Sequence, residues 1–129
     1  MATYYEYTIS NVFEIENETS FINEIKKMNG ENFFYKIENN KYVIKSYDSL
    51  CSSTENSEEE YYYYQDDYYK LIQKYIKENQ IVLISSIGYG KLRYFTAGIV
   101  KITKDNIESK DAFESVKKEL GVEKINIFD

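Results

Sequence analysis

The alternation of apolar and polar residues predicts a strand followed by a short helix at the start of the chain. Residues 3 to 15 alternate in places with a period of two, which suits a strand with one buried side. Apolar positions in residues 19 to 28 follow helical spacing, and Asn29-Gly30 supplies the left-handed residues that end helices. The two faces of the strand carry Tyr5, Tyr7 and Ile9 on one side, and Tyr4, Glu6 and Thr8 on the other.

Residues 32 to 38 and 41 to 47 predict a β-hairpin. Both ranges are rich in aromatic and β-branched residues, which favour strands, and Asn39-Asn40 between them can adopt the positive φ of a tight turn. The residues that follow, 48 to 57, are small and polar and have no apolar period. They predict a polar, acidic loop.

A capping box predicts where the longest helix begins. Ser57 stands three residues before Glu60, and such a pair satisfies the free amides at a helix N-terminus. Helical spacing continues from there to about Glu78. The side of this helix that should face the core carries Tyr61, Tyr64, Tyr68, Leu71, Ile72 and Tyr75.

The remaining residues predict a second hairpin, a third helix and a final strand. Residues 81 to 87 form a buried strand, Gly88-Tyr89-Gly90 turns the chain, and residues 92 to 103 return as a longer strand. Ser109 caps a helix, and residues 122 to 128 suggest a last strand. The expected order is β-α-β-β-α-β-β-α-β, an α+β fold with a mainly antiparallel sheet and about three helices.

Length and composition indicate one folded domain over residues 1 to 129. The chain is near the commonest size of a single domain, with 43% hydrophobic and 29% charged residues. Its apolar runs are far shorter than the roughly 20 residues needed to cross a bilayer, and its N-terminus lacks the pattern of an export signal. A single cysteine, Cys51, excludes an internal disulfide. We therefore expect a cytoplasmic protein that binds no membrane.

The catalytic chemistry open to this chain is narrow. The sequence contains no histidine, which removes the commonest general base and zinc ligand, and one cysteine is too few for a thiolate metal site. We therefore expect no enzyme, no cofactor and no metal site. A carboxylate-dependent enzyme stays open as an alternative, because folding can bring Asp and Glu together from distant positions.

Negative charge is concentrated in one segment, residues 46 to 69. The net charge of the chain is -6, whereas this segment has seven acids and no base, so the rest of the chain sums to +1. The acids are Asp48, Glu55, Glu58, Glu59, Glu60, Asp66 and Asp67. Net negative charge repels phosphates, so we expect no direct binding of nucleic acid, although Lys91 and Arg93 stand beside aromatic residues.

Tyrosine accompanies this charge. The chain has 15 tyrosines, and in the predicted helix Tyr62, Tyr63 and Tyr69 fall outside the buried stripe and should be exposed. Carboxylates around flat, amphipathic rings suit protein binding, since tyrosine buries a large area with few rotors and carboxylates match Arg and Lys. A solvated helix is the alternative, in which the acids of residues 58 to 60 and the later lysines follow the helix dipole.

In a short acidic chain, the run EEEYYYYQDDYY resembles the small phage anti-defence proteins that mimic nucleic acid, of the antirestriction and anti-CRISPR type. The resemblance implies a cytoplasmic inhibitor in a bacterial or archaeal host, which occupies the nucleic-acid-binding groove of a restriction or CRISPR nuclease. It implies phosphate-like roles for Glu58, Glu59, Glu60, Asp66 and Asp67, and base-like or hot-spot roles for Tyr62, Tyr63 and Tyr69. The chain departs from this pattern at Lys70, Lys74 and Lys77, which confines the mimicry to the first half of the helix and the loop before it.

These features together predict an inhibitor, monomeric or homodimeric, that binds a basic nucleic-acid-handling protein through the eight residues just named. An immunity or antitoxin-like protein that blocks a toxin is physically similar and is the second interpretation. The carboxylate-dependent enzyme is the third. The three differ in the molecule that the chain must contact.

Overall fold

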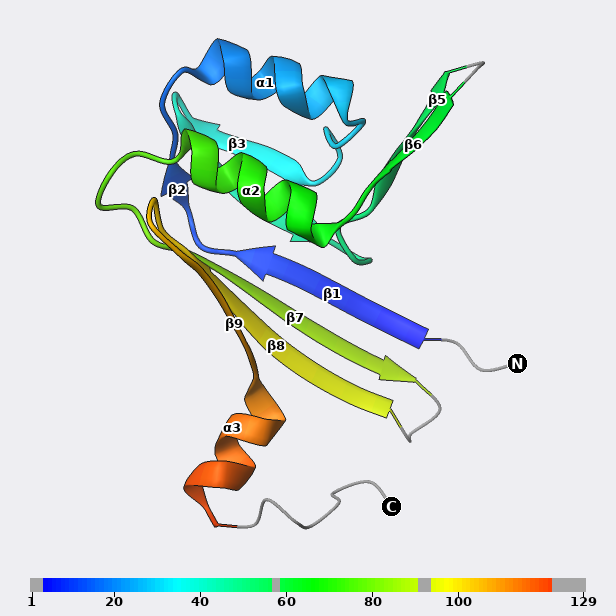
Figure 1. Ribbon diagram of the computed structural model, residues 1–129, viewed down its shortest axis with the longest axis vertical. Coiled ribbons are helices and arrows are strands. Elements are labelled where there is room, and N and C mark those ends of the chain that lie inside the picture. The colour runs from blue at the N-terminus through cyan, green and yellow to red at the C-terminus, as the bar shows by residue number, and fades with distance from the viewer. Residues whose placement is uncertain (1–3, 57–58, 91–93, 122–129) are drawn as a thin grey trace.

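The computed structural model describes residues 4–56, 59–90 and 94–121, which form a large sheet, a separate hairpin and three helices (Figure 1). The large sheet consists of β1 (Tyr4–Ser10), β2 (Phe13–Glu14), β3 (Phe34–Glu38), β4 (Lys41–Ser46), β7 (Val82–Gly90), β8 (Tyr94–Ile102) and β9 (Ile107–Asp111). The separate hairpin consists of β5 (Ser52–Asn56) and β6 (Glu59–Tyr63). The helices are α1 (Glu18–Lys27), α2 (Gln65–Tyr75) and α3 (Ala112–Glu119). The predicted α+β class with a mainly antiparallel sheet is confirmed.

Strand β4 has partners on both edges in one half of the large sheet, and β7 has partners on both edges in the other half. β3 pairs with one edge of β4, while β1 and β2 share its other edge, β1 near the end of β4 and β2 near its start. β1 then pairs with β7, β7 with β8, and β8 with β9. These pairs are all antiparallel, an arrangement in which one face of a sheet can remain in contact with water.

The first helix and the first hairpin follow the sequence prediction closely. The Asn17 side chain accepts a hydrogen bond from the Ser20 amide at 3.4 Å at the start of α1, and the helix ends before Asn29, which has a positive φ of 56°. In the turn between β3 and β4, Asn40 has a φ of 65°. Asparagine adopts this backbone region more readily than most residues. The end of α1 and the turn between β3 and β4 could therefore be located from the sequence.

The helix predicted over residues 57 to 78 begins later and is shorter. Ser57 lies outside the described residues and Glu60 belongs to β6, so the predicted capping box does not begin the helix. Instead, β6 pairs with β5, which lies inside the segment predicted to be a polar loop. Tyrosine favours strands, and the cross-strand pairs satisfy the backbone groups that a helix would otherwise satisfy. α2 therefore begins only at Gln65.

Two boundaries in the second half of the chain also differ. β7 continues through Gly88-Tyr89-Gly90, where a turn was expected, because β1 and β8 pair with it on both edges. Ser109, the expected helix cap, belongs to β9, and the cap is Asp111, whose Oδ1 accepts a hydrogen bond from the Glu114 amide at 2.9 Å. The last strand, predicted over residues 122 to 128, lies outside the described residues.

The hydrophobic core lies between the helices α1 and α2 and one face of the sheet. Phe21 of α1 contacts the rings of Phe34, Tyr42 and Tyr75 edge to face, with centroid distances between 5.3 and 5.5 Å. α2 contributes Tyr68, Tyr69, Leu71, Ile72 and Tyr75 to the same core. On β1 the buried side is the polar one: Thr8 is buried, and its hydroxyl oxygen lies 3.3 Å from that of Ser86.

Tyr68 is completely buried between the end of α1 and strand β3. Its ring contacts Phe33 edge to face at a centroid distance of 5.4 Å and lies 6.2 Å from the ring of Phe34. Gly30 lies directly against this ring, because a Cβ atom added to Gly30 would stand 2.7 Å from both Cε1 and the hydroxyl oxygen of Tyr68. Glycine is therefore required at this position by close packing.

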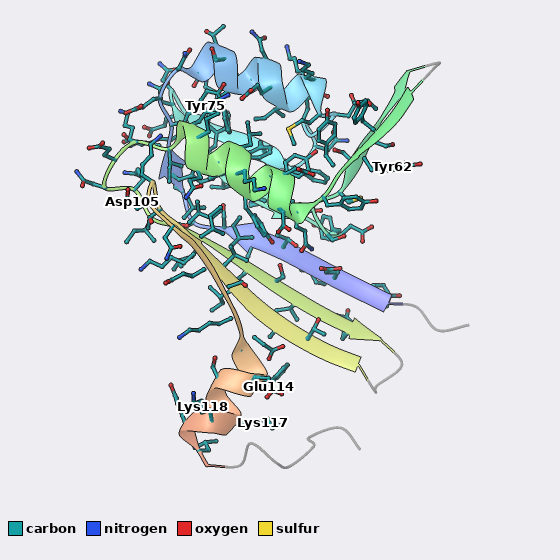
Figure 2. The ribbon with its side chains drawn as sticks, viewed as in Figure 1. Tyr62, Tyr75, Asp105, Glu114, Lys117 and Lys118 are labelled. Atoms are coloured by element: carbon teal, nitrogen blue, oxygen red, sulfur yellow. The ribbon has the colours of Figure 1, made fainter. Side chains whose placement is uncertain are left out.

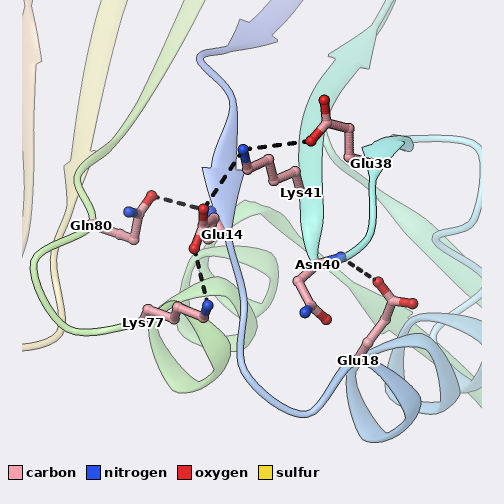
Figure 3. A network of polar contacts seen from close by, with 7 residues as sticks. All are labelled: Glu14, Glu18, Glu38, Asn40, Lys41, Lys77 and Gln80. Carbon is pink, nitrogen blue, oxygen red and sulfur yellow. Dashed lines mark hydrogen bonds and ion pairs between the residues drawn. The ribbon is translucent and has the colours of Figure 1, made fainter.

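Ion pairs and hydrogen bonds join β2 and α1 to their neighbours at the edge of the core, and Figure 3 shows those of Glu14 and the hydrogen bond of Glu18 with Asn40. Glu14 pairs with Lys77 at an oxygen-to-nitrogen distance of 3.0 Å, and Glu18 pairs with Lys36 at 2.9 Å. Glu18 also accepts a hydrogen bond from the Asn40 amide at 2.7 Å. The hydrogen bond from Lys77 is the main cause that lowers the pKa of Glu14, and the hydrogen bond from Lys36 is the main cause that lowers the pKa of Glu18.

Gly30→Ala should lower the free energy of unfolding by about 1–3 kcal/mol, because the new methyl group must displace a fully buried ring. Gly98→Ala is the matched control, since a Cβ atom there meets the Lys110 carbonyl oxygen at 3.6 Å, an ordinary contact. Urea unfolding followed by circular dichroism measures both variants. Wild-type stability of Gly30→Ala would contradict the close packing of Tyr68.

Acid should destabilise the fold through Glu14 and Glu18. Their folded pKa values are lowered from the ordinary 4.5, so the unfolded state binds protons more readily than the folded state. The stabilisation is therefore fully present above pH 4.5 and is lost as the pH falls through the lowered pKa values. Urea midpoints measured from about pH 7 to about pH 3 test this. In Glu14→Gln/Glu18→Gln the midpoint should fall less on acidification than it does in the wild type. An equal fall in both proteins would show that other carboxyl groups cause the loss of stability.

Candidate protein-binding site

The acidic tyrosine segment divides into a projecting hairpin and the start of a helix. We call β5 and β6 with their connection, residues 52 to 63, the acidic hairpin. Figure 1 shows its two strands extending away from the helices and apart from the large sheet. The segment thus presents a narrow, two-stranded element where the sequence predicted the end of a polar loop and the start of a helix.

The base of the acidic hairpin is fixed to both neighbouring helices. Ser52 Oγ donates a hydrogen bond to the Met28 carbonyl oxygen at 2.5 Å and makes a second, short hydrogen bond with the Tyr68 hydroxyl. The Asn29 side-chain amide donates to the Ser53 carbonyl oxygen at 2.8 Å. Burial raises the pKa of Tyr68, so its hydroxyl keeps its proton over the physiological range. The end of α1, the middle of α2 and the hairpin base are thereby connected.

Three tyrosines on and beside the acidic hairpin are exposed. Tyr61 and Tyr62 occupy successive positions of β6 and so belong to opposite faces, yet they are 57% and 53% exposed. Figure 2 shows Tyr62 pointing outward from the hairpin. Tyr64, at the junction with α2, is 60% exposed. The exposure of Tyr62 is confirmed, but the predicted burial of Tyr61 and Tyr64 is wrong, because both residues precede the helix whose buried stripe they were expected to join.

Tyr69 and Tyr63 are less accessible than expected. Tyr69 is only 9% exposed, so the prediction that it faces solvent is wrong. Because α2 begins at Gln65, the helix turns a broad stripe inward that includes both Tyr68 and Tyr69. Burial is the main cause that raises the pKa of Tyr69, followed by the charge of Asp66. Tyr63 is partly buried against the core, so only part of its ring remains available to a partner.

The strand register brings acidic residues of the hairpin opposite one another. Glu55 pairs with Glu60 across the two strands, and Asn56 pairs with Glu59. Like charges directly opposite in an antiparallel pair destabilise it. Glu58, the third acid predicted for the site in this region, lies outside the described residues. The register therefore places two acidic positions, Glu55 and Glu60, opposite each other.

Asp66 and Asp67 lie in the first turn of α2, where the helix dipole stabilises negative charge. Asp67 Oδ2 accepts a hydrogen bond from the Tyr64 amide at 2.9 Å, the interaction that Glu60 was expected to supply at an earlier helix start. Asp66 is exposed. Asp67 thus stabilises the start of α2 through this hydrogen bond in addition to carrying charge. Asp66 contributes an exposed negative charge.

Lys74 of α2 and Lys77, which follows the helix, pair with other elements of the fold. Lys74 pairs with Glu24 of α1 at 3.1 Å, and Lys77 pairs with Glu14 of β2 at 3.0 Å. Among the side chains that the structure describes, neither aspartate at the start of α2 forms an ion pair. The negative charge at this end of the helix is therefore not neutralised by the lysines that follow it in the sequence.

A cavity of about 300 Å³ opens where the acidic hairpin meets α2. Tyr64 and Asp66 both line this space. The other residues that line it are Ser49, Leu50, Cys51 and Gln65. A tyrosine and an acid in one mixed lining suit a long cationic side chain, whose stem can pack against a ring and whose charge is attracted by a carboxylate.

No protein-family model matches the chain, and no curated protein or solved structure is significantly similar to it. In the part of the chain that the structure describes, there is no group of three or more His, Cys, Asp or Glu positioned to hold a metal ion. The helices described here are all too short or too polar to cross a membrane. Function is therefore inferred from the chemistry of the acidic hairpin and its surroundings.

Beside the predicted site residues, Tyr61 and Tyr64 are exposed and Glu55 stands in register with Glu60, whereas Tyr69 is buried. A signal for the hairpin is present in the sequence, because Ser52-Ser53-Thr54 and the run of tyrosines contain residues that strands accept. The same tyrosines also fit helical spacing, and for that reason the sequence predicted a helix and not a hairpin. Four identical residues in succession satisfy a period of two as well as they satisfy a period of 3.6.

Glu55→Lys should raise the free energy of unfolding by roughly 0.2–1 kcal/mol, because it replaces a like-charge pair with Glu60 by an attractive one. Glu78→Lys is the control, since it makes the same charge change at an exposed residue outside the hairpin and should shift stability by less than about 0.5 kcal/mol. Urea unfolding of both variants decides the matter. A loss of stability in Glu55→Lys relative to the control would mean that this acid helps the fold.

Proposed function

We propose that this protein is an inhibitor that occupies the basic, nucleic-acid-binding surface of another protein with its acidic hairpin and the start of α2. The observation that carries the proposal is the grouping of exposed tyrosines with acids on one projecting element. The opposed acids weaken the pairing of the hairpin strands, and contact with a basic groove would offset that cost.

The spacing of the hairpin residues supports imitation of a nucleic-acid strand. Residues on the same face of a strand stand about 6.5 Å apart, so an acid and a ring can alternate along each face at that spacing. β6 places Glu59 and Tyr61 on one face, and Glu60 and Tyr62 on the other. Each face thus offers an acid followed by a ring, as a phosphate is followed by a base.

The cavity beside the hairpin supplies a second point of attachment for a basic partner. An arginine or lysine of the partner would insert between the Tyr64 ring and the Asp66 carboxylate. A cation held against both an aromatic face and a carboxylate is attracted by each of them. Arginine fits best, because its planar guanidinium can stack on the ring while it donates to the carboxylate.

The resemblance to antirestriction and anti-CRISPR inhibitors indicates the class of partner, a restriction or CRISPR nuclease with a basic groove. Lys70, Lys74 and Lys77 are the departure from that pattern. Because Lys74 pairs with Glu24 and Lys77 with Glu14, these two lysines serve contacts with α1 and β2 and leave the acidic end of the helix undisturbed. An immunity protein that blocks a toxin would use the same surface, and only the captured partner separates the two roles.

Glu59→Lys/Asp66→Lys should abolish inhibition while the fold survives, since Asp67 keeps its capping hydrogen bond. The partner is first captured from a lysate of the bacterial or archaeal host on immobilised wild-type protein and identified by mass spectrometry. Displacement of labelled DNA or RNA from the purified partner then measures inhibition. The double variant should require at least about tenfold more protein for half-displacement, and added salt should weaken the wild type in the same direction.

The matched control is Glu78→Lys/Asp105→Lys, which makes the same change in net charge at two other exposed positions. Figure 2 shows Asp105 on the opposite side of the molecule from Tyr62. This control should inhibit like the wild type. Equal inhibition by all three proteins, or a partner that releases no nucleic acid when it is bound, would exclude the proposed function.

A further inference from the structure

The large sheet has a second face that points away from α1 and α2, and we call it the outer face. On β7 the residues Val82 and Ile84 are buried in the core, so the residues that alternate with them belong to the outer face. The register of the neighbouring strands extends this face over β1 and β8. Its large apolar side chains are Tyr5, Tyr7 and Ile9 of β1, Leu83, Ile87 and Tyr89 of β7, and Ile99 of β8.

The outer face is organised in cross-strand rows. Tyr5 stands opposite Tyr89, and their rings stack with centroids 5.2 Å apart. Tyr7 stands opposite Ile87 in the next row, and Tyr47 contacts the Tyr7 ring edge to face at 5.4 Å. Side chains that already contact each other lose less conformational freedom when a partner covers them. The rows therefore form a preorganised surface.

The area of this surface is large for a single chain. The seven strand residues are each between 37% and 52% exposed, and Tyr47 is 83% exposed. If a whole large side chain presents about 200 Å², the exposed parts of these eight residues amount to roughly 800 Å². The largest apolar patch on a typical monomer is about 300–600 Å², whereas each partner of a stable interface buries about 800 Å².

Charge on the outer face lies toward its ends. Lys45 stands opposite Ile9 at one edge. At the other end, the rows that contain Leu83 and Ile99 continue into charged residues of β8 and β9, namely Lys101, Glu108 and Lys110. These five residues and α3 line a cavity of about 460 Å³, whereas the rows of Tyr5 with Tyr89 and of Tyr7 with Ile87 are apolar. The acids that dominate the net charge are instead gathered in the acidic hairpin. Two copies of the chain can therefore meet through the middle of this face without opposing like charges.

From these observations we infer that the outer face is a homodimer interface, on which a second copy of this chain packs sheet against sheet. The contact is isologous, so each row of tyrosine and isoleucine meets the same rows of the other copy about a two-fold axis. The two sheets lie about 10 Å apart, as in a β-sandwich. This interface is independent of the acidic hairpin and of the function proposed for it.

Sedimentation velocity of the full chain at about 1 to 100 µM tests the inference. The wild type should form a dimer, and Tyr7→Lys/Ile87→Lys should weaken dimerisation at least about 100-fold, because four lysines would meet at the centre of the interface. Ile87→Thr should weaken dimerisation less, and its threonine is a residue that strands accept. This variant tests the inference if the double variant fails to fold. Circular dichroism checks the folding of each variant.

Tyr61→Lys is the control, because it changes an exposed tyrosine of the acidic hairpin, which lies outside the large sheet. It should dimerise like the wild type and, under the proposed function, should inhibit poorly, whereas the outer-face variants should still inhibit. A monomeric wild type over the whole range, or a dimer unaffected by the outer-face variants, overturns the inference. If the wild type is monomeric and full-length Ile125→Asp/Ile127→Asp dimerises, the C-terminal segment covers the face instead.

Discussion

The fold depends on the burial of one tyrosine. Tyr68 fills the space between the end of α1 and β3, and Gly30 has no side chain because that ring occupies its place. The Tyr68 hydroxyl also bonds to Ser52, which in turn donates to the carbonyl oxygen of Met28. A buried hydroxyl needs such a partner, and here the partner is the first residue of the acidic hairpin. The same contact that completes the core therefore fixes the base of the projecting element.

The ion pairs that hold the fold together and the acids of the hairpin lie in different parts of the molecule. Lys41 and Lys77 pair with Glu14, and Lys74 pairs with Glu24, which holds helices and strands together at the edge of the core. The acids of the hairpin belong to a separate sheet, in which Glu55 occupies the register position opposite Glu60. The acids that support folding and the acids of the hairpin are thus separated in space. This separation, and the exposed tyrosines beside the hairpin acids, are the reason to look for a partner outside the chain.

The two surfaces singled out above differ in the physics by which they would bind. The acidic hairpin combines rings with like charges on a narrow element, an arrangement that favours a basic groove and depends on salt. The outer face is broad, apolar in its middle and organised in cross-strand rows, which favours a flat partner of the same kind. Because the hairpin is a separate sheet, one surface can be occupied without covering the other. A dimer would then present two acidic hairpins.

The sequence alone determined the α+β class, the positions of α1 and the β3–β4 hairpin, and the concentration of acids and tyrosines in residues 46 to 69. Those features depend on local periodicity and on asparagine at positive φ, which nearby residues decide. Tertiary structure decided that residues 59 to 63 form a strand, that Tyr61 and Tyr64 are exposed and that Tyr69 is buried. The reason is that consecutive tyrosines fit either period, so only the pairing of β6 with β5 and the packing of α2 on the sheet could choose between them.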